Sequence, residues 1–443
     1  MKNWILILLL FIAVPSFSQQ GWEYKRMSDM PINTTNNALE GLILSQGAFV
    51  YSFGGIKDSL KRDEIHSSCF KYDVKNDNWS KVGKIPDSIP RFGAKASFIK
   101  NRIYLTGGFF YDSVFLIDQN ESSLQRITSN KVNIFNPFLD TFEVDAAPLK
   151  LSVGEHSQAV WRDSLLYVIS GVHSKSLSRQ VQVYNPAFNT WSLATPVPDN
   201  HFFKSKGASA SIIGDTIYYF GGVSGDAIMS SKNYLRKGVI DKSDPTQIEW
   251  YFVGSISGAS TYKAVGSSHN RELFFFGGAG EGHQENGIAF NSQKRVQGKP
   301  LVFTYNTSSQ EYSSVVETHF TFMDGGGIAK LGGGNWLIAG GIDSSGVASN
   351  RTLLLHNKSL SNISSATQPP EFKVISENNQ FRIVTKNVGD IVVYDLTGKK
   401  LYEAGKGLAD LLIPKDFFNS SYLIFIYDDS SNVPVSRKLY LMR

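Results

Sequence analysis

Most residues of this sequence that could do chemistry are charged or imidazole side chains close to recurring glycine pairs. Glu281 and His283 follow the pair Gly277-Gly278, and others stand about fourteen residues before a pair. Carboxylate, imidazole and ammonium groups that share one site can hydrogen-bond a polar or anionic ligand, and can also transfer protons. The candidate ligand-binding residues are Arg91, Glu155, His156, Lys204, Lys206, Lys263, Glu281, His283 and Asp324.

The sequence offers little for metal or nucleophilic catalysis. Its eight His residues show no His-x-x-x-His spacing, and the lone Cys69 cannot form a zinc cluster. The glycine runs at 325–327 and 332–334 lack the Lys-Ser/Thr that ends a phosphate-binding loop. We therefore expect no bound metal, no cofactor and no catalytic nucleophile.

Composition and charge exclude two broad classes of protein. The 443 residues are 42% hydrophobic, 13% aromatic and only 19% charged, which excludes a fully disordered chain. Lys and Arg total 44 against 39 Asp and Glu, a net charge of +5 without blocks of one sign. An electrostatic nucleic-acid binder would need such blocks, so we expect no nucleic-acid partner.

The elements that must position these side chains form an internal repeat. An apolar run ending in a glycine pair occurs six times, with pairs starting at 54, 107, 170, 221, 277 and 340, and Ser170 replaces one glycine. Two aromatics seven residues apart then follow in most units, as in Tyr72/Trp79, Phe135/Phe142, Tyr184/Trp191 and Tyr305/Tyr312; the fourth unit offers Ile240 and Trp250 instead. Each unit predicts four short antiparallel strands.

These residues resemble the kelch motif over about residues 21–365. The resemblance implies an all-β fold, a six-bladed kelch-type β-propeller, with the strand near Trp22 completing the last blade. In kelch propellers, the loops after the glycine pairs and those entering the first strands emerge on one face. The candidate residues are therefore expected to share a loop-rich mouth on that face.

The two ends of the chain differ from the repeat. Lys2, an apolar run over 4–14 and small residues at 16 and 18 predict a signal peptide over 1–18, hence a secreted or cell-surface protein, and no later segment is a transmembrane candidate. The propeller would then occupy 19–362, with a linker over 363–370. Residues 371–443 resemble the C-terminal sorting domain of the type IX secretion system of Bacteroidetes, which implies a small β-sandwich-like domain and that machinery as a partner.

Three functions remain open from the sequence. The first is a binding module that holds a glycan or protein ligand in the mouth. The second is a carbohydrate-active enzyme, similar to the exported sialic-acid mutarotase of kelch type, in which Arg91, Glu155, His156 or Glu281 would transfer protons. The third is a scaffold that only displays loops. The copper enzyme galactose oxidase needs a Tyr–Cys crosslink, for which the position of Cys69 in a third strand is unsuitable.

Overall fold

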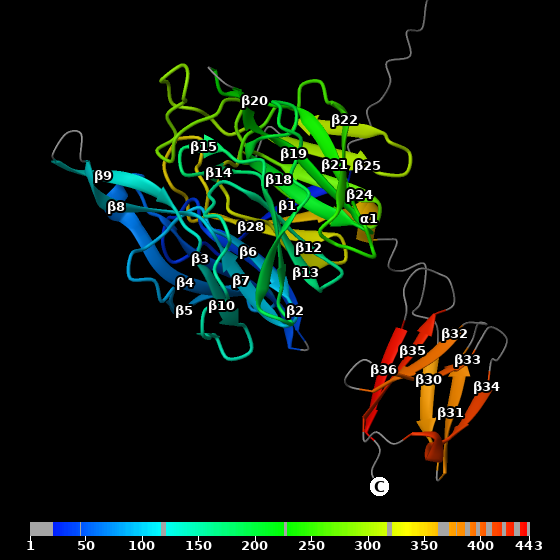
Figure 1. Ribbon diagram of the computed structural model, residues 1–443. Coiled ribbons are helices and arrows are strands. Elements are labelled where there is room, and N and C mark those ends of the chain that lie inside the picture. The colour runs from blue at the N-terminus through cyan, green and yellow to red at the C-terminus, as the bar shows by residue number, and fades with distance from the viewer. Residues whose placement is uncertain are drawn as a thin grey trace, which may run out of the picture. The chain divides into compact units, whose positions relative to one another are not determined.

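The computed structural model describes residues 21–44, 46–116, 121–225, 228–316, 321–361, 372–377, 379–385, 390–395, 399–404, 410–418, 422–428 and 435–440. The chain divides into two compact units, the first ending at Lys358 and the second beginning at Ser359 (Figure 1). The expected signal peptide and linker, 1–18 and 363–370, lie outside the described residues. Within the described ranges, no helix combines the length and apolarity needed to cross a bilayer.

The first unit is a ring of six four-stranded antiparallel sheets, the blades (Figure 1). From the inner to the outer strand they are blade one, β2 (Ala38–Leu44), β3 (Gly47–Ile56), β4 (Ile65–Asp73) and β5 (Asn78–Lys84); blade two, β6 (Lys95–Ile99), β7 (Arg102–Thr106), β10 (Val132–Asn136) and β11 (Thr141–Phe142); blade three, β12 (Ser157–Trp161), β13 (Leu165–Ile169), β16 (Val181–Asn185) and β17 (Thr190–Ala194); blade four, β18 (Lys206–Ile213), β19 (Thr216–Ser224), β21 (Tyr234–Ile240) and β22 (Ile248–Ser255); blade five, β23 (Val265–His269), β24 (Glu272–Phe276), β25 (Leu301–Asn306) and β26 (Tyr312–Val316); and blade six, β27 (Ala329–Gly332), β28 (Asn335–Ala339), β29 (Thr352–Asn357) and β1 (Trp22–Met27).

Blade six joins the two ends of the ring. The N-terminal strand β1 pairs antiparallel with β29, from Trp22 opposite Asn357 to Met27 opposite Thr352. The Trp22 ring packs 5.4 Å from Phe274 and 5.0 Å from Phe276, both on β24 of blade five. Inner strands β27 and β2 pack side by side, as do β2 and β6. The unit is thus a closed six-bladed β-propeller of kelch type, in which each sheet buries both faces against its neighbours.

The repeated aromatics are cross-strand partners in the outer hairpins. Tyr72 lies opposite Trp79 and Tyr184 opposite Trp191, as the spacing predicts. In blade four, which departs from this spacing, Ile240 lies opposite Ile248 and not opposite Trp250. Trp250 lies opposite Gly238 instead, where a Cβ would approach the indole to 2.5 Å. The missing side chain of Gly238 is what admits the tryptophan ring.

The glycine pairs have left-handed backbone at the end of the second strand. Gly277 has φ +65°, and a Cβ there would lie 2.2 Å from the Phe322 carbonyl oxygen of the next blade. Ser170 takes the same conformation in blade three, with φ 57°. Its hydroxyl lies 2.8 Å from two acceptors, the carbonyl oxygens of Ser178 and Ser205, and can donate to either of them. The pair therefore permits a close approach between blades that most residues would block.

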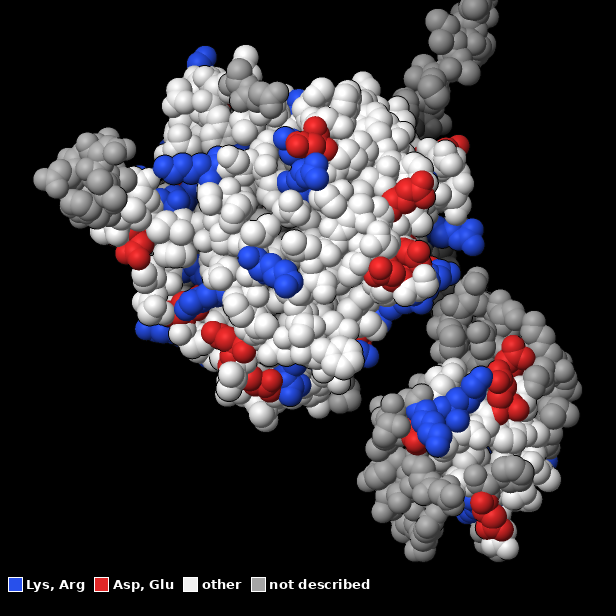
Figure 2. Space-filling view, viewed as in Figure 1, with Lys and Arg blue, Asp and Glu red and all other residues white. Residues whose placement is uncertain are grey.

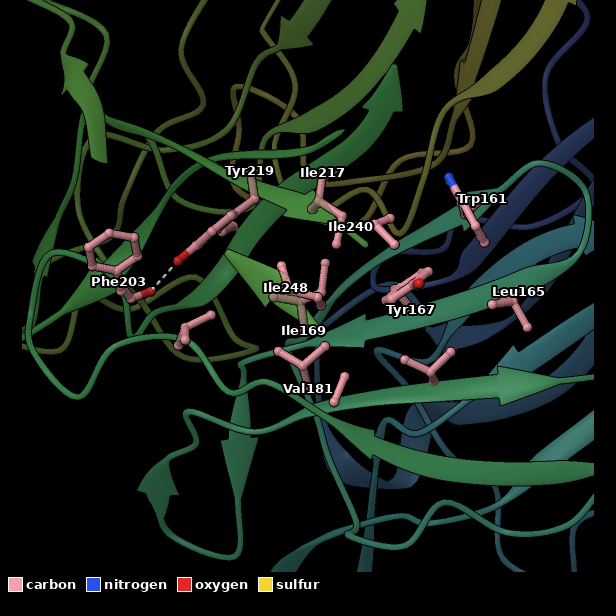
Figure 3. Packing of buried hydrophobic residues seen from close by; sticks show 14 residues of the cluster. Trp161, Leu165, Tyr167, Ile169, Val181, Phe203, Ile217, Tyr219, Ile240 and Ile248 are labelled. Carbon is pink, nitrogen blue, oxygen red and sulfur yellow. Dashed lines mark hydrogen bonds between the residues drawn. The ribbon is translucent and has the colours of Figure 1, made fainter. Parts of the chain in front are cut away.

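The hydrophobic core lies between the blades. In Figure 3, side chains from blade three, including Tyr167 and Ile169, meet Ile217 and Tyr219 of blade four. Each fully buried side chain of this size stabilises the fold by about 1.5–3 kcal/mol. The Tyr219 hydroxyl donates to the Phe203 carbonyl at 2.8 Å, so the polar end of this buried side chain is hydrogen-bonded.

Two hairpins follow the glycine pairs of blades two and three, β8 (Phe109–Leu116) with β9 (Glu121–Thr128) and β14 (Val172–His173) with β15 (Ser176–Leu177). The short elements η1 (Arg62–Glu64) and β20 (Ser230–Ser231) complete this unit, and α1 (Lys358–Ser361) spans the boundary to the second unit.

The second unit is a small β-sandwich-like domain. One sheet contains β30 (Phe372–Ser376), β31 (Gln380–Thr385) and β34 (Asp410–Pro414), and the other contains β32 (Asp390–Tyr394), β33 (Lys400–Ala404), β35 (Tyr422–Asp428) and β36 (Val435–Tyr440). A core that includes Phe381, Val393 and Phe425 is buried within this unit. Residues 396–398, between β32 and β33, lie outside the described residues.

Candidate functional site

Six equivalent residues, one for each blade, form a ring at the entrance to the inner strands. All have left-handed backbone, with φ between 50° and 64°. The N–H of one such residue donates to the carbonyl of its equivalent in the preceding blade, at 2.9 Å from Asn36 to Asp324, 2.8 Å from Gly93 to Asn36, 2.7 Å from Gly207 to Glu155 and 2.8 Å from Lys263 to Gly207. This inner ring consists of Asn36, Gly93, Glu155, Gly207, Lys263 and Asp324.

Four side chains of the inner ring converge because their backbones share this conformation. The Lys263 ammonium donates to Asn36 Oδ1 at 3.1 Å and lies 3.4 Å from Asp324 Oδ2. It also lies 3.7 Å from Glu155 Oε1. Asn36 in turn donates from Nδ2 to Asp324 Oδ2 at 3.3 Å. Four blades thus contribute one polar group each to a single point.

Three further side chains surround these four. His283 Nε2 lies 2.8 Å from Asp324 Oδ1, and the ring of Tyr262 meets the His283 ring edge-on at 5.0 Å. Lys206 Nζ lies 3.6 Å from Glu155 Oε2 and 4.0 Å from the centre of the Phe290 ring. We call Asn36, Glu155, Lys206, Tyr262, Lys263, His283 and Asp324 the axial cluster.

The carboxylates of the axial cluster are held in the ionised form. Burial alone would raise the pKa of Glu155, but Lys206, Lys263 and Arg126 outweigh it and lower that pKa to about 2. Burial likewise opposes ionisation of Asp324, yet His283 and Lys263 hold its pKa far below the ordinary value. The two carboxylates in turn raise the pKa of Lys263. The cluster therefore offers fixed charges and hydrogen-bonding groups, and its carboxylates are not proton donors near neutral pH.

Loops from opposite sides of the ring cover the axial cluster. Glu285, in the loop after the glycine pair of blade five, accepts from Arg126 Nη1 at 2.9 Å and from the Tyr111 hydroxyl. Arg126 and Tyr111 belong to the β8–β9 hairpin of blade two. Beneath this contact, the Glu155 and Lys263 side chains are at most 10% exposed, and Asp324 is fully buried.

A polar channel runs along the axis between the inner strands. Its volume is about 120 Å³, below the roughly 300 Å³ at which small-molecule pockets begin. The Glu40 carboxylate accepts from the Gly41 and Phe98 main-chain N–H groups, and Lys95 donates to the Gly326 carbonyl at 3.1 Å. Burial raises the pKa of Glu40 to about 7 and, with Lys263, lowers that of Lys95 to about 8.

Five of the nine candidate residues meet in the axial cluster, namely Glu155, Lys206, Lys263, His283 and Asp324.

The other four candidates lie outside the axial cluster. Arg91 is buried within blade two, where it donates to Asp87 and to the Gly107 carbonyl, both at 2.6 Å. His156 contacts Thr106 and Gln158 beside the inner strands. Lys204 pairs with Asp199 at 2.6 Å, and Glu281 accepts from Ser292 within its own loop.

Sequence reasoning missed four residues that complete the site. Asn36 and Tyr262 carried a usable signal, because aligning the six strand entries places Asn36 at the same position as Glu155 and Tyr262 directly before Lys263. Arg126 and Glu285 belong to loops that follow no repeat pattern, and they meet across the ring. No spacing along the chain could have paired them.

Away from the axial cluster, the described residues form a pocket of about 640 Å³ between blades two and three, lined by residues that include Lys100, Arg102 and Asn185. Among the residues that the structure describes, no group of three His, Cys, Asp or Glu side chains could hold a metal ion. Cys69 is buried, and burial raises the pKa of its thiol. On the face shown in Figure 2, basic and acidic side chains of the propeller are interspersed.

No protein-family model matches the chain. Kelch repeat and BTB domain-containing protein 12 of Homo sapiens is 25% identical over 237 residues, covering 49% of this chain and 36% of that protein. Kelch-like protein 15 of Mus musculus is 24% identical over 217 residues, covering 46% and 32%. The chain thus spans about a third of the length of these curated relatives.

Among solved structures, that of YjhT aligns with a TM-score of 0.57 at 16% identity, covering 75% of this chain and 97% of that one. At this identity the likeness concerns the fold alone. Together with the sheet order and the similarity to kelch-repeat proteins, it supports a kelch-type β-propeller for the first unit of this chain.

Proposed function

We propose that the propeller is a carbohydrate-binding module and that the axial cluster holds the ligand. The observation that carries this proposal is the position of Glu155. Its two carboxylate oxygens stand 3.6 Å from Lys206 and 3.7 Å from Lys263, beyond hydrogen-bond distance. Glu155 Oε2 is buried without a hydrogen-bond partner among the described residues, and an acceptor of this kind suits the hydroxyl groups of a sugar.

The energetics of the cluster support a role beyond folding. Removing an ion from water costs several kcal/mol even after relaxation, and well-packed apolar residues often replace a buried ion pair without loss of stability. Yet Glu155 and Asp324 are buried, with Lys206 and Lys263 around them. Fixed acceptors beside fixed ammonium donors are the groups that orient polyhydroxy ligands.

Acid–base catalysis is the less suitable reading of the same groups. Both carboxylates are ionised well below neutral pH, so neither can act as a general acid. Both ring nitrogens of His283 face acceptors, the Asp324 carboxylate at 2.8 Å and the Glu281 carbonyl at 3.2 Å.

A glycan array followed by titration calorimetry on the full chain tests the proposal. Glu155→Gln removes a charged acceptor and should weaken binding of any glycan hit by about 10- to 100-fold, the equivalent of 1.5–3 kcal/mol. Lys204→Met is the matched control, since Lys204 pairs with Asp199 outside the cluster. Absence of binding to any glycan, or an equal loss in the control, would overturn the proposal and favour a protein ligand or a display scaffold.

We further propose that the protein is secreted and that residues 371–443 are its sorting domain. The proposal is supported by the charged, apolar and small-residue pattern of 1–18 and by the separate β-sandwich-like unit after Lys358. Expression in a type IX-secreting Bacteroidetes host should yield extracellular protein that begins near Gln19, and deletion of 371–443 should retain it in the periplasm. Export of the truncated chain would contradict the assignment, and intact-mass measurement of both fractions decides.

A further inference from the structure

Glu285 links two loops that lie on opposite sides of the propeller. It stands 159 positions from Arg126 and 174 from Tyr111 in the sequence, yet it contacts both. Its loop belongs to blade five and theirs to blade two, which face each other across a ring of six. The Glu285 side chain is 16% exposed, so the contact is sheltered by the loops themselves.

The groups that hold Glu285 form a carboxylate site with its own supports. One carboxylate oxygen accepts from the Tyr111 hydroxyl and the other from the Arg126 guanidinium. Arg126 is also stacked 4.7 Å above the Phe109 ring, and Arg62 lies 4.7 Å above the Tyr111 ring. Both donors are therefore held in place without Glu285. An arginine beside a neutral hydroxyl donor recognises a free carboxylate by the same chemistry.

The loop that carries Glu285 is anchored at its base and polar at its tip. Ala279, Ala289 and Val296 of this loop are buried with Met323 and Ile342 of blade six. The contact of Glu285 with the hairpin, in contrast, is an ion pair plus one hydroxyl bond. A partly exposed pair of this kind contributes only about 0–1 kcal/mol, so a competing anion can replace it at small cost.

The contact is also electrostatically coupled to the axial cluster. Glu285 is one of the charges that raise the pKa of Lys263, and Arg126 is one of those that lower the pKa of Glu155. The site of Arg126 and Tyr111 is therefore electrostatically continuous with the cluster below it.

We propose that Glu285 is an internal stand-in for a carboxylate of the ligand. It occupies a subsite made by Arg126 and Tyr111, and a carbohydrate that bears a carboxylate displaces it, opening the mouth as it binds. This inference rests on the proposed carbohydrate-binding function and specifies the ligand as a sugar acid, for which the same two donors provide the recognition.

Calorimetry with glucuronate and with glucose on the full chain tests this inference. Glu285→Gln weakens the internal competitor and should raise the affinity for glucuronate by up to about 5-fold, the most that about 1 kcal/mol allows, while leaving the affinity for glucose unchanged. Glu281→Gln is the matched control, because Glu281 lies on the same loop but bonds Ser292 and not the hairpin. Arg126→Met should abolish the preference for glucuronate.

Amide hydrogen exchange in β8 and β9 gives a second readout that needs no ligand. Exchange should be faster in Glu285→Gln than in the parent chain or in Glu281→Gln. Binding of glucose and glucuronate with no gain in Glu285→Gln overturns the stand-in and leaves the carbohydrate module intact. If no variant binds either sugar or any other glycan, both the carbohydrate-binding function and the proposed role of Glu285 are overturned. Unchanged exchange in β8 and β9 overturns the proposed role of Glu285 alone.

Discussion

The main-chain N–H of Asn36 donates to the carbonyl of Asp324 at 2.9 Å, although 288 positions separate the two residues in the sequence. This bond closes the inner ring at the point where blade six meets blade one. On the outer side of blade six, β1 pairs with β29. The propeller is therefore closed twice, once near its axis and once at its rim, and both closures join the beginning of the ring to its end.

Asp324→Asn should lower the free energy of unfolding by about 3–5 kcal/mol, the cost of leaving buried charges without their partner. Asn tolerates left-handed backbone and keeps the main-chain bond to Asn36, so the change isolates the charge. Urea unfolding measures the effect. Asp63→Asn, at an exposed position, is the control and should stay within about 0.5 kcal/mol. Equal stability of the two variants would show that the charge of Asp324 is not needed for the fold.

Trp22→Ala should cost about 3–5 kcal/mol, because the indole fills the space against Phe274 and Phe276 of blade five. Lys25→Ala, exposed on the same strand, should be near neutral. Deletion of residues 21–30 should abolish cooperative unfolding of the whole ring, as followed by calorimetry. An unchanged melting transition after that deletion would rule out closure by β1.

Glu40→Gln should change how stability depends on pH. Burial raises the pKa of Glu40 from 4.5 to about 7, so its stabilising contribution is complete below pH 4.5 and is lost as pH rises through about 7. At about 1.4 kcal/mol for each pKa unit, the rise from 4.5 to about 7 corresponds to a loss of about 3–4 kcal/mol. Relative to the parent chain, the variant should gain stability between pH 4.5 and 7.5 in urea titrations. Parallel curves for the two proteins would mean that Glu40 ionises in the folded state as it does in water.

At lower pH, Glu155 and Asp324 should dominate the loss of stability. Their folded-state pKa values are depressed, so their contribution is present above the ordinary pKa near 4 and is lost as pH falls, for Glu155 toward about 2 and for Asp324 at still lower pH. The Glu155→Gln variant should therefore lose less stability than the parent chain between pH 4.5 and 2. A steeper loss in the variant than in the parent would contradict the depressed pKa of Glu155.

Gly277→Ala should destabilise the ring by more than the backbone strain alone. Both Gly277 and Gly258 have left-handed backbone, but a Cβ at Gly277 would lie 2.2 Å from the Phe322 carbonyl oxygen, whereas no heavy atom lies within 4 Å at Gly258. Gly258→Ala should cost about 1–2 kcal/mol and Gly277→Ala about 1–3 kcal/mol more. Similar denaturation midpoints for the two would show that the blades can separate without penalty.

The architecture was predictable because its signals are local and repeated. The left-handed turn favours glycine, and a hairpin with paired rings needs aromatics at a fixed spacing. Units such as the one with Tyr72 and Trp79 can therefore be recognised in the sequence. The fourth unit shows the limit of prediction from such local signals. Nothing in its sequence says that Trp250 faces Gly238, because that register depends on the longer turn after Ile240.

The site was predictable only where it follows the repeat. Glu155, Lys263 and Asp324 enter their inner strands at equivalent positions, so one blade informs the next. Arg91 also precedes an inner strand, but two positions earlier than its equivalents in the inner ring, and it turns into blade two to pair with Asp87. Such a difference in direction depends on side-chain packing and leaves no trace in spacing.

The inner ring also has a consequence for how such a protein can change its ligand. A different side chain at one of its six positions changes the group that faces the axis, provided that the position has room for a Cβ. The position of Gly93 has room for a side chain, because a Cβ there would lie 3.6 Å from Phe109. The position of Gly207 has no room for a side chain, because a Cβ there would lie 2.2 Å from the ring of Tyr262. Substitution at one blade can thus change the preference for a ligand, and Gly93 of blade two is the position where a fifth polar group fits.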